Sequence, residues 1–184
     1  MLFRSDLGFF VDRNVGDVDL EGVDLQVGFV ANDWMTVSAN ASYNNSELKS
    51  DLRASATATL PTKGKKFVET PDYTFGGRID LRPIPNLTVG LEGKYVGDRF
   101  STDVNDAKVS AYKIFHLNAA YDFEVARLKG LRAQFTIYNL FDEEFFGNIS
   151  SSTNAITTNG VTGSAPTLSL GAPRSMSLTI QARF

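Results

Sequence analysis

The sequence has 184 residues and contains no cysteine, a single histidine and no long apolar run. Without cysteine, neither a disulfide framework nor a thiolate metal site can form, and one histidine excludes a His-rich zinc centre. Lysine and arginine number 18 against 21 aspartates and glutamates, so the net charge of -3 favours no nucleic-acid partner. No stretch approaches the about 20 apolar residues of a membrane-spanning helix, which excludes helical spanning.

The first residues do not form a secretory signal peptide, because Arg4 and Asp6 interrupt any apolar core there. Residues 1–5 resemble a translated sequencing adapter, and we therefore expect them to be artefactual. On this interpretation the chain is a piece of a longer protein, and the missing signal says nothing about its parent.

Seven segments alternate apolar and polar residues with period two, and no stretch of similar length keeps the helical period of about 3.6. We therefore predict an all-β protein. An eighth, partial strand is expected within Leu2 to Val11, where Leu7, Phe9 and Val11 set the phase. The apolar positions of the seven segments span residues 23–29, 35–43, 73–81, 87–95, 115–123, 131–137 and 176–184.

The lengths of the strands and of their connections favour a membrane barrel. Strands of about 9 to 12 residues suit a tilted bilayer crossing, whereas strands of soluble proteins average about 5 to 6. Short links at 32–34, 83–86 and 124–130 alternate with long links at about 44–72, 97–110 and 142–172. Tight turns at one rim and long loops at the other are typical of outer-membrane barrels. The pattern predicts an antiparallel transmembrane β-barrel segment of seven to eight long strands.

Aromatic residues occur at both ends of the predicted strands, as expected at two lipid–water interfaces. Aromatic residues are also common in the strands of soluble proteins, so this feature does not by itself distinguish a membrane barrel from a soluble β protein. Those at the long-loop ends are Tyr43, Tyr73 and Tyr95, and those at the short-turn ends are Trp34, Tyr121, Phe123 and Phe184.

The polar face of the strands carries charged residues beside many small ones, which fits a water-filled or plugged lumen. One allowed register across the turn at 83–86 sets Arg78 opposite Glu92, a cross-strand pair of about 0.2 to 1 kcal/mol. Two independently solvated side chains are the alternative. The charged residues are Arg78, Asp80, Arg82, Glu92, Lys94 and Arg132.

Four motifs resemble the C-terminal end of the TonB-dependent outer-membrane receptors. Asn139-Leu-Phe-Asp-Glu-Glu-Phe145 resembles the segment that ends the penultimate strand, although Phe145 stands where Tyr is commoner. Gly171-Ala-Pro-Arg174 resembles the Gly-x-Pro-Arg start of the last strand. Arg183-Phe184 resembles the terminal aromatic signal for barrel assembly, and Gly22-Val-Asp-Leu25 a Gly-Val-Glu-Leu strand start.

The resemblance implies that residues 1–184 are the C-terminal third of a 22-stranded barrel, without the plug domain and TonB box of the family. It implies uptake of a siderophore, cobalamin or carbohydrate ligand across the bacterial outer membrane, with energy from TonB. The implied partners are the TonB system through the plug, outer-membrane lipid and lipopolysaccharide, a bulky nutrient, and the barrel-assembly machinery through Phe184.

No enzymatic activity, cofactor or metal site is expected from the sequence. A catalytic triad needs a histidine oriented by a carboxylate, and His116 lies mid-strand on the polar face, where a lumenal hydrogen bond is the favoured role. Asp142-Glu-Glu144 lacks the spacing of a calcium loop and fits a hydrated strand end better. Lys63-Gly-Lys-Lys66 could attract lipopolysaccharide or an anionic ligand, although a solvated loop tip is the favoured interpretation.

The last long link, Phe145 to Pro173, contains 29 residues and no charged side chain. A mobile extracellular loop is the favoured interpretation. The functional alternative is a loop that closes over ligand, because long loops often carry recognition. Its candidate apolar contacts are Phe145, Phe146, Ile149 and Ile156.

Two other interpretations of the whole chain stay open at this point. A stand-alone eight-stranded outer-membrane barrel with an adhesion or structural role fits the strand count. A soluble β-sandwich lectin is opposed by the strand lengths and by the sorting of the loops.

Overall fold

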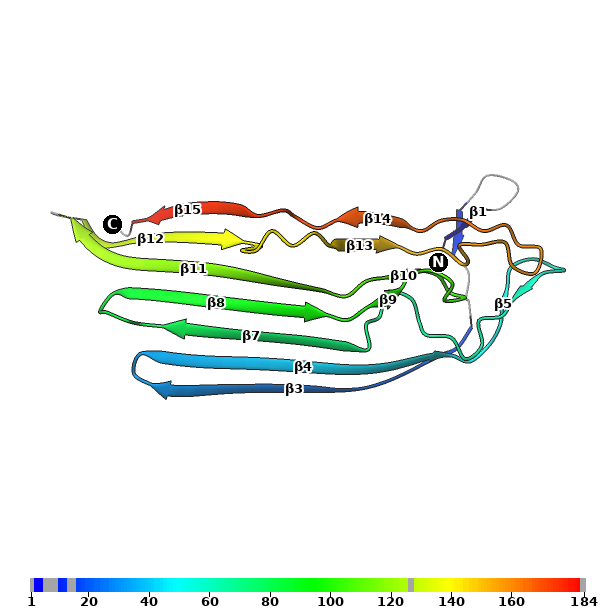
Figure 1. Ribbon diagram of the computed structural model, residues 1–184, viewed down its shortest axis with the longest axis horizontal. Helices are drawn as coiled ribbons and strands as arrows, with labels where there is room; N and C mark the ends of the chain where they lie inside the picture. Colours follow the sequence, from blue (N-terminus) through cyan, green and yellow to red (C-terminus); the bar gives the residue numbers. More distant parts are fainter. Residues whose placement is uncertain (1, 5–9, 13–15, 126–127, 183–184) are drawn as a thin grey trace.

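The computed structural model describes residues 2–4, 10–12, 16–125 and 128–182. Seven long strands form one antiparallel sheet in the order β15-β12-β11-β8-β7-β4-β3 (Figure 1). The predicted all-β, antiparallel fold is confirmed, and each of the seven strands overlaps one of the seven alternating segments, although β3 and β4 extend several residues beyond theirs. No helix in the described part of the chain is long and apolar enough to cross a membrane. The strands are β3 (Val18–Asn32), β4 (Met35–Leu48), β7 (Tyr73–Leu81), β8 (Leu87–Val96), β11 (Tyr112–Val125), β12 (Leu128–Tyr138) and β15 (Ser175–Gln181).

The predicted eighth strand is not part of this sheet. β1 (Leu2–Arg4) and β2 (Phe10–Asp12) pair only with each other, and Leu7 and Phe9 lie outside the described residues. Gly16 has a φ of 112°, a conformation open mainly to glycine, which separates this segment from β3. Three further short pairs lie in the long connections: β5 (Leu52–Arg53) with β6 (Thr59–Leu60), β9 (Arg99–Phe100) with β10 (Lys108–Val109), and β13 (Phe146–Ser150) with β14 (Thr167–Leu170).

The short turns have local sequence causes. At the β3–β4 turn the Asn32 side-chain oxygen accepts a hydrogen bond from the backbone N–H of Trp34 at 3.1 Å. At the β7–β8 turn Asn86 takes a φ of 68°, which asparagine tolerates better than most residues. These turns lie at one end of the sheet, and the long connections lie at the other (Figure 1).

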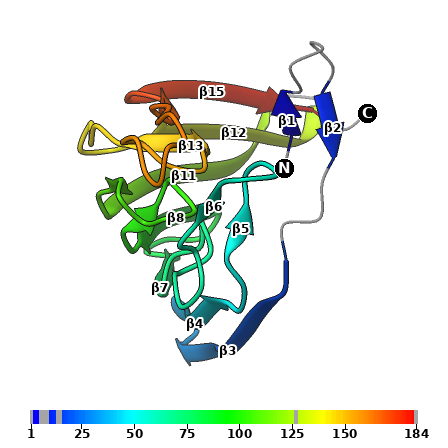
Figure 2. The same cartoon turned by 90° about the vertical axis from the view of Figure 1, so that its right-hand side faces the viewer.

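The sheet is a curved, open wall. Viewed along the strands it forms an arc from β15 to β3 (Figure 2), and β3 and β15 are not paired with each other in the described residues. One face exposes large apolar side chains, including Val23 at 67 % and Leu178 at 68 % exposure. No second sheet of comparable length covers this face in the described part of the chain. The apolar face therefore points away from the molecule, which does not fit a β-sandwich.

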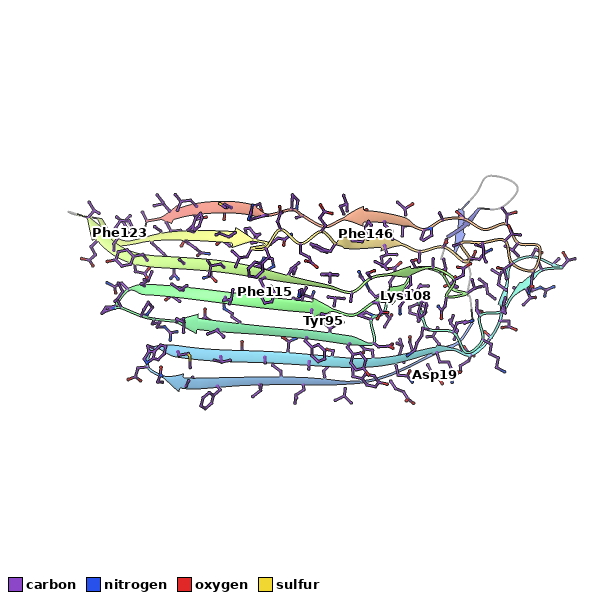
Figure 3. All side chains as sticks on the ribbon, viewed as in Figure 1. Asp19, Tyr95, Lys108, Phe115, Phe123 and Phe146 are labelled. Atoms are coloured by element: carbon purple, nitrogen blue, oxygen red, sulfur yellow. The ribbon has the colours of Figure 1, made fainter. Side chains whose placement is uncertain are left out.

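Aromatic rings form rows at both ends of the apolar face. At the long-loop end the ring centroids of Tyr43 and Tyr73 are 5.2 Å apart, and those of Phe75 and Tyr95 are 5.9 Å apart. At the short-turn end Tyr121 and Phe123 stack with centroids 6.2 Å apart. Figure 3 shows Tyr95 and Phe123 toward opposite ends of the sheet. These rows agree with the two predicted interfacial belts.

Candidate functional site

A hydrogen-bonded charged network lies at the centre of the polar face. The Arg78 guanidinium donates to the Asp80 carboxylate at 2.9 and 2.7 Å and lies 3.4 Å from that of Glu92. It also donates to the Asn118 amide oxygen at 3.0 Å. The register pairs Arg78 with Glu92, so the predicted cross-strand pair is confirmed. Because these side chains are partly solvated, each ion pair contributes about 0 to 1 kcal/mol, and the network mainly fixes side-chain positions.

A cavity of about 350 Å³ adjoins this network and is lined from β7, β8, β11 and β12. Within it, His116 Nδ1 accepts a hydrogen bond from the backbone N–H of Asn139 at 3.1 Å. The Tyr138 ring meets the imidazole edge-on, with centroids 5.8 Å apart. His116 therefore has the hydrogen-bonding role on the polar face that the sequence predicts.

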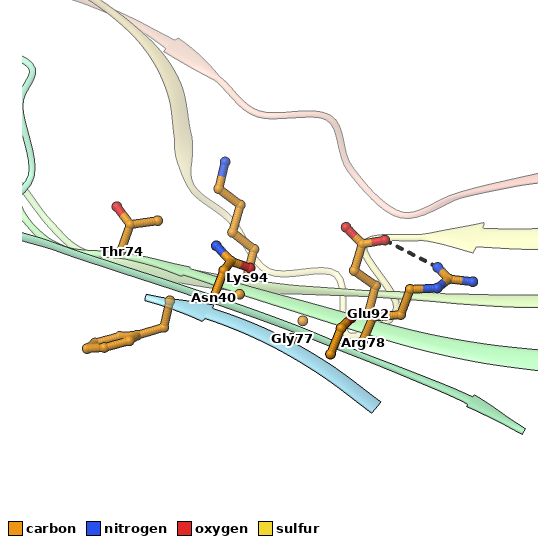
Figure 4. Close-up of a pocket in the computed structure, with 10 residues that line it drawn as sticks. Asn40, Thr74, Gly77, Arg78, Glu92 and Lys94 are labelled. Carbon is orange, nitrogen blue, oxygen red and sulfur yellow. Dashed lines mark hydrogen bonds and ion pairs between the residues drawn. The ribbon is translucent and has the colours of Figure 1, made fainter. Parts of the chain in front are cut away.

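A second hollow of about 290 Å³ lies where β4, β7 and β8 meet (Figure 4). Arg78, Glu92 and Lys94 extend from the same face around it (Figure 4). A Cβ on Gly76 would lie only 2.4 Å from the Asn40 side-chain oxygen, so glycine leaves room for that amide. The hollow offers both signs of charge and amide groups, which suits a polar occupant.

The two C-terminal motifs, 139–145 and 171–174, are bound to each other. The Asn139 side chain donates to the Ala172 carbonyl at 3.1 Å, and the backbone N–H of Arg174 donates to the Asp142 carboxylate at 2.8 Å. The Phe145 ring lies against Gly171, where a Cβ would come within 2.2 Å of the ring. Residues that are distant in sequence thus form one joint at the start of β15, with Asp142 as one of its acceptors.

The three long connections interlock into what we call the loop unit, residues 49–72, 97–111 and 145–173. Backbone N–H groups of Asp103 and Val104 donate to the carbonyls of residues 152 and 153, each at 3.1 Å. Asn105 exchanges two hydrogen bonds with the backbone of Lys66, at 2.8 and 3.0 Å. Leu52, Leu60 and Val104 form a buried apolar core within the unit. The connections are therefore packed together rather than independent.

Asp106 joins the second and third connections. Its carboxylate accepts hydrogen bonds from the backbone N–H groups of Ala155, at 2.9 and 3.0 Å, and Ile156, at 3.0 Å. Burial acts to raise the pKa of Asp106, but these donors and the Thr102 hydroxyl outweigh it and lower the pKa below its usual value. Asp106 thereby fixes the backbone from which the Ile156 side chain extends.

Two buried charged groups of the loop unit are incompletely satisfied. Arg99 Nε and Asp103 Oδ2 have no hydrogen-bond partner. Arg99 is otherwise held through Nη2, which donates to the Phe146 carbonyl at 3.1 Å, and by the Tyr112 ring 5.6 Å away. Burial raises the pKa of Asp103 to about 6.

The four candidate ligand contacts in 145–173 lie in different environments. Phe145 stacks on Tyr112 with centroids 4.5 Å apart, and Ile149 is only 5 % exposed. Phe146 is 38 % and Ile156 is 67 % exposed. The structure does not gather the four into one surface, and Phe146 and Ile156 are the two that present substantial apolar area to solvent. Ligand contact by these residues stays a prediction.

Two further sequence predictions concern the ends of the chain. Phe184, the expected assembly signal, lies outside the described residues, as do Met1 and Ser5 of the expected artefact.

The lysine-rich segment 63–66 lies in the loop unit. Its Lys66 ammonium pairs with Asp72 at 3.0 Å.

The comparisons with known proteins agree with this geometry. The model of the family "TonB dependent receptor-like, beta-barrel" matches residues 2–140. The ferrichrome outer membrane transporter/phage receptor of Escherichia coli strain K12 is 24 % identical over 146 residues, which cover 78 % of this chain. The chain spans only 19 % of the length of that relative.

Solved structures of larger proteins contain the same sheet. The siderophore receptor PiuA from Acinetobacter baumannii superposes with a TM-score of 0.70 at 20 % identity, over 97 % of this chain and 23 % of its own. The ferric yersiniabactin uptake receptor FyuA from Yersinia pestis gives 0.69 at 16 % identity, over 93 % and 24 %. The chain is located in the bacterial outer membrane and belongs to the TonB-dependent receptor-like β-barrel family.

Proposed function

We propose that the chain forms part of the wall of a receptor that imports an iron–siderophore complex across the outer membrane with energy from TonB. The observation that supports this most directly is the family match over residues 2–140. A relative named as a ferrichrome transporter, a structural neighbour named as a siderophore receptor and another named as a ferric yersiniabactin uptake receptor favour this ligand class over cobalamin or carbohydrate. In this proposal the chain performs no covalent chemistry.

The proposed parent protein is a 22-stranded barrel of which residues 1–184 are the C-terminal third. The free edges of β3 and β15 would then pair with the remaining strands, since an unpaired edge exposes its backbone hydrogen-bonding groups. Sequencing the gene upstream of the Met1 codon tests this organisation. A reading frame that continues through a plug domain is expected, and a stop codon followed by a signal peptide would instead establish a small stand-alone barrel.

Each part of the described structure has a place in this proposal. The polar face lines the lumen, where the network around Arg78 and the hollow beside Lys94 would face the plug domain that contacts TonB. The loop unit lies at the extracellular rim and would meet the ligand first. Phe184 would serve the barrel-assembly machinery, and the apolar face would meet outer-membrane lipid and lipopolysaccharide.

Uptake of radiolabelled iron by cells that express the complete gene product tests the proposed function. Iron supplied as ferrichrome, as a catecholate complex and as a carboxylate complex is compared in a strain without other receptors for these complexes. Uptake of at least one complex is expected, and it is expected to stop when TonB is deleted. Labelled cobalamin or maltodextrin taken up in place of all three complexes would overturn the siderophore assignment.

Ligand binding is expected to weaken about tenfold in the variant Ile156→Asp, because an exposed apolar contact is replaced by a solvated charge. Ile156 is 67 % exposed at the surface of the loop unit. The matched control is Ile84→Asp at the opposite rim, where Ile84 is 54 % exposed in the β7–β8 turn. Equilibrium binding of the transported complex to whole cells measures both. Equal affinities for Ile156→Asp and wild type would remove Ile156 from the ligand surface.

A further inference from the structure

The third connection of the loop unit, residues 145–173, reverses its direction at a tight turn formed by Asn159 and Gly160. Both residues have a positive φ, 51° and 78°, and the flanking Thr158 and Val161 exchange two backbone hydrogen bonds, at 3.0 and 2.9 Å. Asparagine followed by glycine is the pair that such a two-residue turn prefers, and this is the only Asn-Gly pair in the sequence. Both residues are exposed, so water reaches the turn.

The turn is held against the rest of the loop unit by two contacts. The Asn159 side-chain amide donates a hydrogen bond to the Thr59 carbonyl of the first connection at 3.0 Å, across one hundred positions of sequence. The Val161 side chain packs against the buried apolar core of the loop unit. The hydrogen bond requires the amide, because an ionised carboxylate has no hydrogen to donate. Asn159 therefore joins the third connection to the first.

The same asparagine lies beside a backbone nitrogen that is free to react with it. In the described part of the chain the Gly160 N–H donates to no acceptor, and a Cβ added at Gly160 would meet no atom within 4 Å. A backbone nitrogen that follows an asparagine can attack the side-chain carbonyl carbon, and glycine has no side chain to obstruct the attack. Asn154, in the same connection, is the opposite case. It is buried, and the N–H of the following Ala155 donates to the Asp106 carboxylate.

We propose that Asn159 is a site of spontaneous deamidation, and that the reaction releases the third connection of the loop unit from the first. The Gly160 nitrogen forms a bond to Cγ of Asn159, its proton passes through water to the side-chain nitrogen, and that nitrogen leaves as ammonia. Water then opens the succinimide ring at either carbonyl carbon and gives aspartate or isoaspartate, so the reaction needs no oxidant and no enzyme.

Both products remove the contact between the connections. Aspartate has no hydrogen to donate to the Thr59 carbonyl and places a negative charge against that oxygen. Isoaspartate also lengthens the backbone by one methylene group between Thr158 and Val161, which opposes their pairing. Either product introduces a charged side chain into a segment that otherwise has none. The site does not depend on which ligand the receptor transports.

Incubation of the complete receptor in detergent, followed by proteolysis and tandem mass spectrometry, tests the chemical step. Aspartate and isoaspartate are expected to accumulate at position 159, faster as the pH rises, because the attacking nitrogen must lose its proton. Asn154 is the internal control and should stay unmodified. A synthetic peptide of residues 153–165 gives the rate without the fold. An intact Asn159 under conditions that convert the peptide would overturn the proposal, and so would equal conversion at Asn154 and Asn159.

Hydrogen exchange of the variant Asn159→Asp in the complete receptor tests the release. The amide of Ala54 donates to the Ala58 carbonyl at 3.0 Å within the first connection. It is expected to exchange about fivefold faster than in wild type, the effect of one lost hydrogen bond. The control Asn159→Gln keeps an amide donor without a charge and should exchange more slowly than Asn159→Asp. Unchanged exchange in Asn159→Asp, or equal acceleration in both variants, would show that the amide does not hold the two connections together.

Discussion

Replacing Leu91 by arginine is expected to lower the free energy of unfolding by about 2 to 4 kcal/mol, the cost of a charge on the lipid face at mid-depth of a barrel. Leu91 lies midway along the lipid face of β8, between Leu87 at the short-turn end and Tyr95 in the extracellular row. Its register partners are Ile79 and Leu117. Neither partner supplies a counter-charge, so the guanidinium must reach for an interface or draw water toward itself.

The control for this effect uses two neighbours on one strand. Leu178 points to the lipid face at 68 % exposure, and Thr179 points to the lumen face, opposite Gln134. Leu178→Arg is expected to be destabilising, whereas Thr179→Arg enters a polar environment and should cost well under about 1 kcal/mol. The measurement is urea unfolding of the complete protein refolded in lipid vesicles. Equal costs at the two positions would reverse the assignment of inside and outside faces.

The strands could be predicted because the information for them is local. A strand with one buried or lipid-facing side must alternate with period two, and a slip of one residue would exchange its faces. The same constraint yielded the register of Arg78 opposite Glu92, which the structure confirms. The first segment does not extend the main sheet as an eighth strand, because the described residues of β1 and β2 use their backbone hydrogen-bonding groups to pair with each other and not with β3.

The loop unit could not be predicted, because its contacts join residues far apart in sequence. Nothing around Asp106 shows that its carboxylate accepts hydrogen bonds from residues 155 and 156, some fifty positions away. Composition indicated an uncharged, polar segment at 145–173, but it does not distinguish Ile149, which is 5 % exposed, from Ile156, which is 67 % exposed. Candidate contacts chosen by apolar character alone therefore combine the exposed Ile156 with a residue of the loop interior.

The loop unit is expected to lose stability as the pH rises, through Asp103. Its side chain is only 7 % exposed and Oδ2 has no hydrogen-bond partner, so burial raises the pKa from 3.8 to about 6. Because the pKa of Asp103 is higher in the folded than in the unfolded state, ionisation of its carboxyl group destabilises the fold. This free-energy penalty is absent below about pH 4, grows as the pH rises, and is complete once the pH has passed through about 6. The two values limit its size to about 3 kcal/mol at neutral pH.

The variant Asp103→Asn isolates this effect, because asparagine cannot ionise while the backbone N–H of residue 103 still donates to Ser152. Hydrogen exchange at the amides of Val104 and Ser152, corrected for intrinsic rates, measures opening of the loop unit. At pH 7 the variant should exchange up to about a hundredfold more slowly than wild type. At pH 4 the two should be nearly equal.

Asp106→Asn, in the same connection, is a control that should change the stability of the loop unit in the opposite direction. The pKa of Asp106 is lowered by the amides that it accepts from, so its stabilisation is present above the usual carboxyl range and is lost as the pH falls through the folded pKa. Its substitution should therefore speed exchange at pH 7, where Asp103→Asn slows it. The ionised forms of two carboxylates three residues apart would then have opposite effects on the stability of the loop unit. Asp103 destabilises it because Oδ2 is buried without a partner, and Asp106 stabilises it through three hydrogen bonds. Faster exchange at pH 7 in both variants would show that Asp103 is stabilised as a carboxylate, and the pH dependence would have to come from other groups of the loop unit.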